Sequence, residues 1–199
     1  MAVLTASTHQ WASSILKGSR SIWFVMPCLL LLRGQDLPAQ TAISKEYQVK
    51  AAFLYNFSQF VVWPTEAFPE AQTPLVIGII GEDPFGAYLD EIVNGEKVNN
   101  RPLIIQRYHQ VEEIKVCHIL FVSQSETKRL EEILARLKGR SILTVGDIDG
   151  FAKQGGMIRF VTEKNKVRFG INVEAAKAAK LTISSKLLRP AEIISPGKD

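Results

Sequence analysis

The stretch VCHILFVSQSETKRLEEILARLKGRSILTVG, residues 116–146, decides the fold of this 199-residue chain. It opens with a continuous apolar run at 116–122, which is typical of a strand covered on both faces. Residues 123–126 match a helix capping box, and Gly139 is a helix-ending glycine. Between them, four aliphatic residues recur at i, i+3, i+4 and i+7, as in an amphipathic helix: Leu130, Ile133, Leu134 and Leu137. A second apolar run at 142–146 completes a strand–helix–strand unit.

The same alternation extends toward the N-terminus. Apolar runs at 75–81 and 102–108 predict strands, and the segment 83–93 between them predicts a helix. Because strand and helix alternate three times, we predict an α/β fold with a mainly parallel sheet and helices on both faces, a Rossmann-like three-layer sandwich. Two later apolar runs, at 157–161 and 167–171, predict a C-terminal β-hairpin.

A long helix is predicted over 44–63, before Pro64. Its apolar side chains form two stripes, so the helix needs two partners. One partner is its own sheet, and the other is a neighbouring helix or another molecule; burial of both stripes in the core is the common alternative. Exposed aromatic residues of this segment would mark a docking surface: Phe53, Phe57, Phe60 and Trp63.

The N-terminal segment has the pattern of a secretory signal. It is basic through Arg20 and then apolar at 22–32, a run too short to span a bilayer. We therefore expect a signal peptide at 1–39 and a single domain at 40–199; a core helix or an uncleaved anchor is the alternative. Removing this segment takes away three basic residues and one acidic residue, which lowers the formal charge from +4 to +2. The remaining charges are interspersed, so we expect no nucleic-acid partner.

The sequence contains no complete motif for catalysis, metal binding or cofactor binding. The turn at 81–86 lacks the lysine of a phosphate loop. Cys117 and His118 are neighbours in a predicted strand, so their side chains point to opposite faces. We expect no catalytic residues, no metal site and no cofactor. Asp147 and Asp149 follow a strand and are either ordinary turn residues or ligands at the strand ends.

Several segments, in order, resemble the YfiR family of periplasmic proteins, and the resemblance covers about residues 46–194. The segments are EYQVKAAFLYNF (46–57), VWP (62–64), IGEDPFG (80–86), CHILF (117–121), LTVGD (143–147), GGMI (155–158), FGIN (169–172) and SSKLL (184–188). The ordered set is more specific than any single piece.

The resemblance implies a non-enzymatic periplasmic repressor. Such a protein docks on the sensory domain of an inner-membrane diguanylate cyclase, lowers cyclic-di-GMP synthesis and restrains biofilm formation, and an OmpA-like outer-membrane lipoprotein can sequester it. One departure concerns cysteines: the well-studied type of member has paired cysteines, whereas here Cys117 has no partner once residues 1–39 are removed, so thiol–disulfide control is not expected.

The first hypothesis is therefore a periplasmic interaction protein that docks through its first helix and neighbouring loops. Arg168 and Asn172, at the end of the hairpin, are further candidates for partner binding; the alternative is a surface charge and a helix cap. The second hypothesis is a small-molecule sensor or transport accessory protein with an apolar pocket near Gly81 and Asp147. An envelope enzyme ranks last, and homodimer formation is left open.

Overall fold

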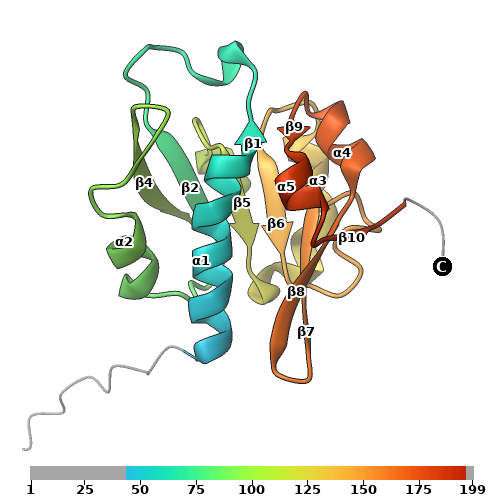
Figure 1. Ribbon diagram of the computed structural model, residues 1–199. Helices are drawn as coiled ribbons and strands as arrows, with labels where there is room; N and C mark the ends of the chain where they lie inside the picture. The colour runs from blue at the N-terminus through green and yellow to red at the C-terminus, as the bar shows by residue number, and fades with distance from the viewer. Residues whose placement is uncertain (1–43, 196–199) are drawn as a thin grey trace, which may run out of the picture. The chain divides into compact units, whose positions relative to one another are not determined.

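The computed structural model describes residues 44–195, and the expected signal peptide at 1–39 lies outside them. Their central feature is an eight-stranded sheet in the order β10-β8-β7-β6-β5-β2-β4-β3 (Figure 1). Its strands are β2 (Leu75–Ile80), β3 (Lys97–Val98), β4 (Arg101–Tyr108), β5 (Ile119–Val122), β6 (Leu143–Gly146), β7 (Ile158–Glu163), β8 (Lys166–Ile171) and β10 (Glu192–Ile193).

The middle of the sheet is parallel, as the sequence predicts. β7, β6, β5, β2 and β4 run in one direction, and β2 lies between β4 and β5. β3 and β8 are antiparallel to their neighbours β4 and β7. The predicted hairpin is confirmed: its turn residues Lys164 and Asn165 have φ angles of 49° and 61°, the positive values that a tight two-residue hairpin turn requires.

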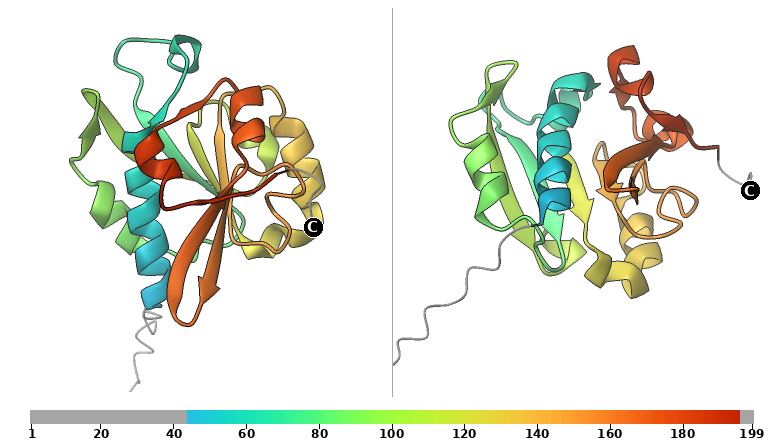
Figure 2. Two further views of the ribbon diagram at one scale, coloured as in Figure 1. Left: turned by 45° about the vertical axis from the view of Figure 1, so that its right-hand side comes forward. Right: turned by 60° about the horizontal axis from the view of Figure 1, so that its bottom comes forward.

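Helices cover both faces of the sheet (Figure 2). α1 (Lys45–Phe60) and α2 (Ala87–Val93) pack on one face, in a core that includes Leu54, Ile77 and Phe121. α3 (Leu130–Leu137) packs on the other face, in a core that includes Leu120 and Ile133. The short helices α4 (Val173–Ala178) and α5 (Ser185–Leu188) extend the first core. The predicted three-layer α/β fold is therefore confirmed.

The first helix is shorter than expected. α1 ends at Phe60, because the next two residues form β1 (Val61–Val62), which pairs antiparallel with β9 (Thr182–Ile183). β-Branched valines favour extended backbone, and the Phe60 carbonyl accepts a hydrogen bond from the Ser184 N–H. The chain after α1 is thus tied to the segment before α5.

Helix starts also differ from the expected pattern. Ser123 makes no side-chain cap, and the residues after it form the 3₁₀ helix η3 (Gln124–Arg129). The Ser125 hydroxyl accepts a hydrogen bond from the Glu82 N–H instead. α2 begins at Ala87 because the Asp83 carboxylate bonds the N–H of Phe85 and stabilises a turn before the helix. Two further 3₁₀ helices are η1 (Thr65–Ala67) and η2 (Val111–Glu113).

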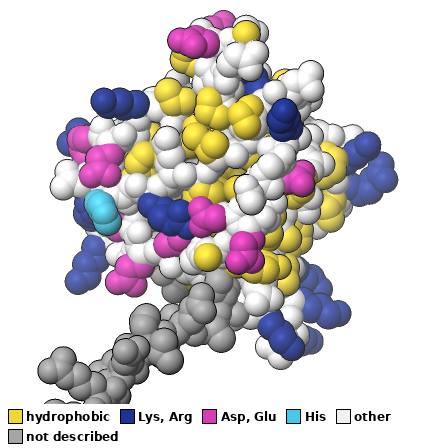
Figure 3. Space-filling model, turned by 90° about the vertical axis from the view of Figure 1, so that its left-hand side faces the viewer, with side chains coloured by type: hydrophobic (Ala, Val, Ile, Leu, Met, Phe, Trp, Pro, Cys, Tyr) yellow, Lys and Arg dark blue, Asp and Glu magenta, His cyan; other side chains and the backbone are white. Residues whose placement is uncertain are grey.

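Basic and acidic side chains lie next to one another on the face that carries α2 and β4 (Figure 3). Arg107 of β4 donates hydrogen bonds to Asp83 and Asp90, at 2.7 and 2.5 Å. The Arg107 charge is therefore neutralised by neighbouring carboxylates. Among residues 44–195, no helix is long and apolar enough to cross a membrane.

Candidate functional site

Two of the four aromatic docking candidates are core residues. Phe57 has no exposed surface and packs against Phe160 and Phe169, with ring centroids 5.8 and 5.4 Å apart. Trp63 is 8% exposed, and its indole N–H donates to the backbone carbonyl of His118 at 3.0 Å. Phe57 and Trp63 are therefore not among the exposed aromatic residues that would mark a docking surface, because both lie where α1 and the chain after it cover the sheet.

The other two aromatic candidates, Phe53 and Phe60, are half-buried and line a groove. This α1–β8–α5 groove has a volume of about 260 Å³. It is lined by Phe53, Asn56, Phe60, Val167, Arg168, Phe169, Lys186, Leu187 and Pro190. Three of the residues predicted for partner binding, Phe53, Phe60 and Arg168, thus come together from elements far apart in sequence.

Aromatic packing makes the floor of the groove rigid. The Phe53 ring lies 5.2 Å from that of Phe169, and it also contacts Phe57 and Phe160, each at 6.0 Å. Such edge-to-face and stacked pairs fix ring orientation. The floor is therefore a preformed apolar surface that is open to solvent on one side.

Arg168 and Lys186 are the charged residues that line the groove, and both are exposed. Arg168 precedes Phe169 in β8 and lines the groove beside it, and Phe169 packs in the core that α1 covers. Neither basic side chain forms an ion pair or hydrogen bond with another described residue. The rim of the groove is thus positively charged.

Asn172 is a helix cap and not a surface group. It is 2% exposed; its side-chain oxygen accepts from the Ala175 N–H, and its amide N–H donates to the Ala152 carbonyl, both at 3.0 Å. The Asn172 side chain is therefore not accessible to a partner in this structure. The capping alternative, which the sequence also offered, is the one that the structure shows.

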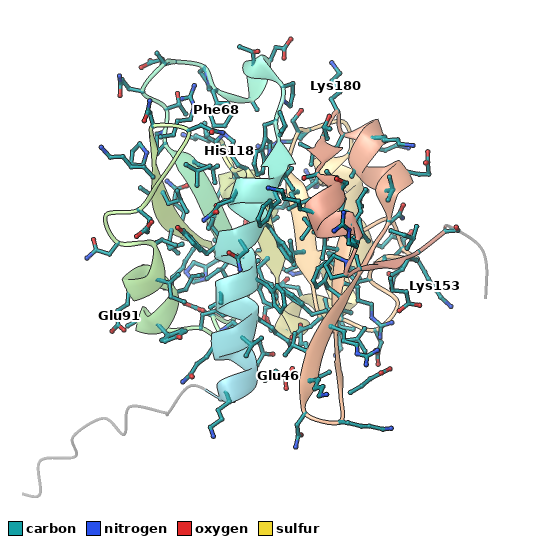
Figure 4. The ribbon with its side chains drawn as sticks, viewed as in Figure 1. Glu46, Phe68, Glu91, His118, Lys153 and Lys180 are labelled. Atoms are coloured by element: carbon teal, nitrogen blue, oxygen red, sulfur yellow. The ribbon has the colours of Figure 1, made fainter. Side chains whose placement is uncertain are left out.

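A buried ion pair, which the sequence analysis missed, lies at the carboxyl end of β6. Lys50 of α1 is 1% exposed, and its ammonium group lies 2.6 Å from Asp147 and 2.5 Å from Glu46. Tyr47 donates its hydroxyl to the same Asp147 oxygen at 2.9 Å. Glu46 lies at the amino end of α1 (Figure 4). The position that the sequence offered for a ligand at Asp147 is therefore occupied by the protein's own side chains.

Charge and burial shift the acidities in this Lys50–Asp147 cluster (Glu46, Tyr47, Lys50, Asp147). The hydrogen bond from Lys50 lowers the pKa of Glu46, and burial together with the Asp147 charge raises the pKa of Tyr47. The second oxygen of Asp147, Oδ1, is buried without a hydrogen-bond partner in the structure. A lysine on the buried stripe of α1, four residues after Glu46, was the sequence signal for this cluster.

His118 lies at the opposite, amino end of the parallel strands, beside Phe68 (Figure 4). It is fully buried; its Nδ1 accepts from the Val76 N–H at 3.0 Å, which makes Nε2 the donor to the Ala67 carbonyl at 3.1 Å. Phe68 stacks on the ring at a centroid distance of 4.3 Å. Burial lowers the pKa of His118 to about 4, so the imidazole is neutral at physiological pH.

Cys117 is packed away from His118, on the other face of the sheet. Burial raises the pKa of its thiol to about 12, so it stays protonated. Among residues 44–195, no group of three or more His, Cys, Asp and Glu side chains is arranged to hold a metal ion.

Fold and site together define a three-layer α/β domain with a half-open aromatic groove and buried polar contacts at both ends of its sheet. A model of the YfiR/HmsC-like family matches residues 47–192, and the chain belongs to that family. No curated protein matches the chain.

Proposed function

We propose that this chain is a periplasmic regulatory protein that binds the sensory domain of an inner-membrane diguanylate cyclase and represses it. Membership of the YfiR/HmsC-like family, over residues 47–192, is the observation that carries the proposal. In this account residues 1–39 export the chain as a signal peptide, and residues 40–199 act as the mature domain. Lower cyclic-di-GMP synthesis would then restrain biofilm formation.

The α1–β8–α5 groove supports docking at the first helix. It offers exposed parts of Phe53 and Phe60 on a rigid aromatic floor, the kind of anchor pocket at which interfaces concentrate their binding energy. An OmpA-like outer-membrane lipoprotein that competes for the chain would release the cyclase, and we include it as a second proposed partner.

Co-purification from an envelope extract tests the proposal. Tagged mature protein should recover a membrane diguanylate cyclase, and deletion of its gene should raise cellular cyclic-di-GMP. Phe60→Asp should lose the cyclase and keep its circular dichroism spectrum, because Phe60 is half-buried; Val49→Asp, at an exposed apolar position on the same helix, is the control. Phe57 is unsuitable because it is fully buried. Unchanged cyclic-di-GMP with no recovered cyclase would refute the proposal.

A small-molecule sensor is the second candidate. A groove of about 540 Å³ lies between α3 and α4, with Leu134, Met157 and Ala175 among its lining residues. This volume is in the range of small-ligand sites. Mass spectrometry of the native protein would favour this function if a metabolite co-purifies and Ala175→Trp, which fills the groove, abolishes its retention.

A further inference from the structure

We infer that the α1–β8–α5 groove recognises an acidic segment that presents one large apolar side chain flanked by carboxylates. The identity of the segment's owner, the sensory domain of the cyclase, rests on the proposed function. The lining of the groove determines which chemistry the segment must have.

The apolar part of the inference comes from the groove's size and lining. About 260 Å³ between Phe53, Phe60 and Leu187 accommodates one aromatic or large aliphatic side chain. Phe53 is already fixed against Phe169, so little ordering is needed when the groove is filled. A preformed pocket of this size fits one protruding anchor side chain better than it fits a flat partner surface.

The acidic part of the inference comes from basic groups that the fold leaves without partners. Six arginines of the described chain bond a carboxylate or backbone carbonyls: Arg101, Arg107, Arg129, Arg136, Arg140 and Arg159. Arg168, on the groove, and Arg189, next to the lining residue Pro190, have no such partner among the described residues. Lys186 adds a third positive charge for which the described residues provide no partner. Carboxylates on the occupant would complete these contacts.

Two other occupants fit less well. A second copy of the chain, docked with twofold symmetry on this groove, would bring Arg168 and Lys186 against the same basic residues of its partner. Such like-charge contacts oppose binding. An uncharged apolar segment would contact the aromatic floor and would leave Arg168 and Lys186 without carboxylate partners.

The two parts of the inference can be tested with a pair of dyes and mature protein. The anionic probe is anilinonaphthalene sulfonate, and the neutral probe is phenylnaphthylamine, which has the same rings without the sulfonate. Arg168→Glu combined with Lys186→Glu should weaken binding of the anionic dye by at least about tenfold, because both cations are replaced by carboxylates that repel the sulfonate, and should leave the neutral dye unchanged. Asn56→Trp, which fills the groove, should abolish binding of both.

The control is Lys128→Glu, an exposed lysine of η3 that lies outside the groove. It should bind both dyes as the wild type does. If the double variant keeps full affinity for the anionic dye, or loses both dyes equally while staying folded, the acidic-segment inference is wrong.

A second arm separates this inference from the proposed function. Purified cyclase sensory domain should bind the wild type, and the double variant should bind it about tenfold more weakly. Binding that is equal for both proteins would refute the inference and leave the proposed function standing. Absence of wild-type binding, alongside the expected dye pattern, would refute the proposed function and leave the groove's chemistry standing.

Discussion

At the amino end of the parallel strands, His118 is buried as a neutral ring with both nitrogens bonded to backbone, whereas at the carboxyl end Lys50 and Asp147 are buried as charges. The first arrangement is fully satisfied. The second is not, because Asp147 Oδ1 has no partner in the structure. The neutral His118 ring joins the η1 segment to the sheet at little electrostatic cost. The Lys50–Asp147 ion pair joins α1 to the end of β6, and it stabilises the fold only as long as both charges are present.

Removal of one charge at the carboxyl end should have the largest effect. Lys50→Ala leaves Asp147 buried and unpaired, so the free energy of unfolding should fall by about 3–5 kcal/mol in urea titrations. Lys50→Met combined with Asp147→Leu removes both charges and should stay within about 1 kcal/mol of the wild type. Lys45→Ala, at an exposed position on the same helix, is the control. A double variant as unstable as Lys50→Ala would contradict the ion-pair explanation.

The amino end should respond to pH. His118 has a pKa of about 4 in the folded protein, and an unfolded histidine has one near 6.5. Below pH 6.5 the unfolded chain therefore binds a proton that the folded chain refuses, so stability should fall between pH 6.5 and pH 4, by about 3 kcal/mol.

Urea titrations at several pH values would isolate this contribution. His118→Gln should lose that part of the pH dependence, whereas His109→Gln, at an exposed histidine, should keep it. Equal pH profiles for the wild type and His118→Gln would show that His118 does not carry the effect.

A smaller effect is expected from a single hydroxyl at the carboxyl end. Tyr47→Phe removes the hydrogen bond to buried Asp147 and should cost about 1.5 kcal/mol. Tyr55→Phe removes a hydrogen bond to Glu96 at the surface and should cost less than about 0.5 kcal/mol. Similar losses in the two variants would mean that burial of Asp147 adds nothing to its hydrogen bonds.

Strong periodic patterns made the main elements predictable. The Leu130–Leu137 helix carries its apolar side chains on one face, and the strands at its two ends are continuous apolar runs. Such patterns depend only on neighbours in sequence. The two-residue strands β1, β3, β9 and β10 carry no period, so they were not predicted.

The candidate site was predicted less completely, because it depends on contacts between distant segments. Phe53 and Phe57 share one stripe of α1, and both pack against Phe160 and Phe169 of the distant hairpin. The sequence alone therefore could not show that Phe57 is fully buried whereas Phe53 is only half-buried. Lys50 looked like a surface lysine because lysines are rarely buried. The burial of Lys50 is explained by its contact with Asp147, which is 97 residues away in sequence and is brought close only by the fold.

Hydrogen exchange of the mature protein, alone and with the cyclase sensory domain, tests the docking claim most directly. If the chain docks through the groove, new protection should appear at the groove segments 53–60, 167–169 and 186–190, and α3 and α4 should be unchanged. Protection confined to the α3–α4 groove, or none in the presence of saturating cyclase domain, would contradict the docking claim.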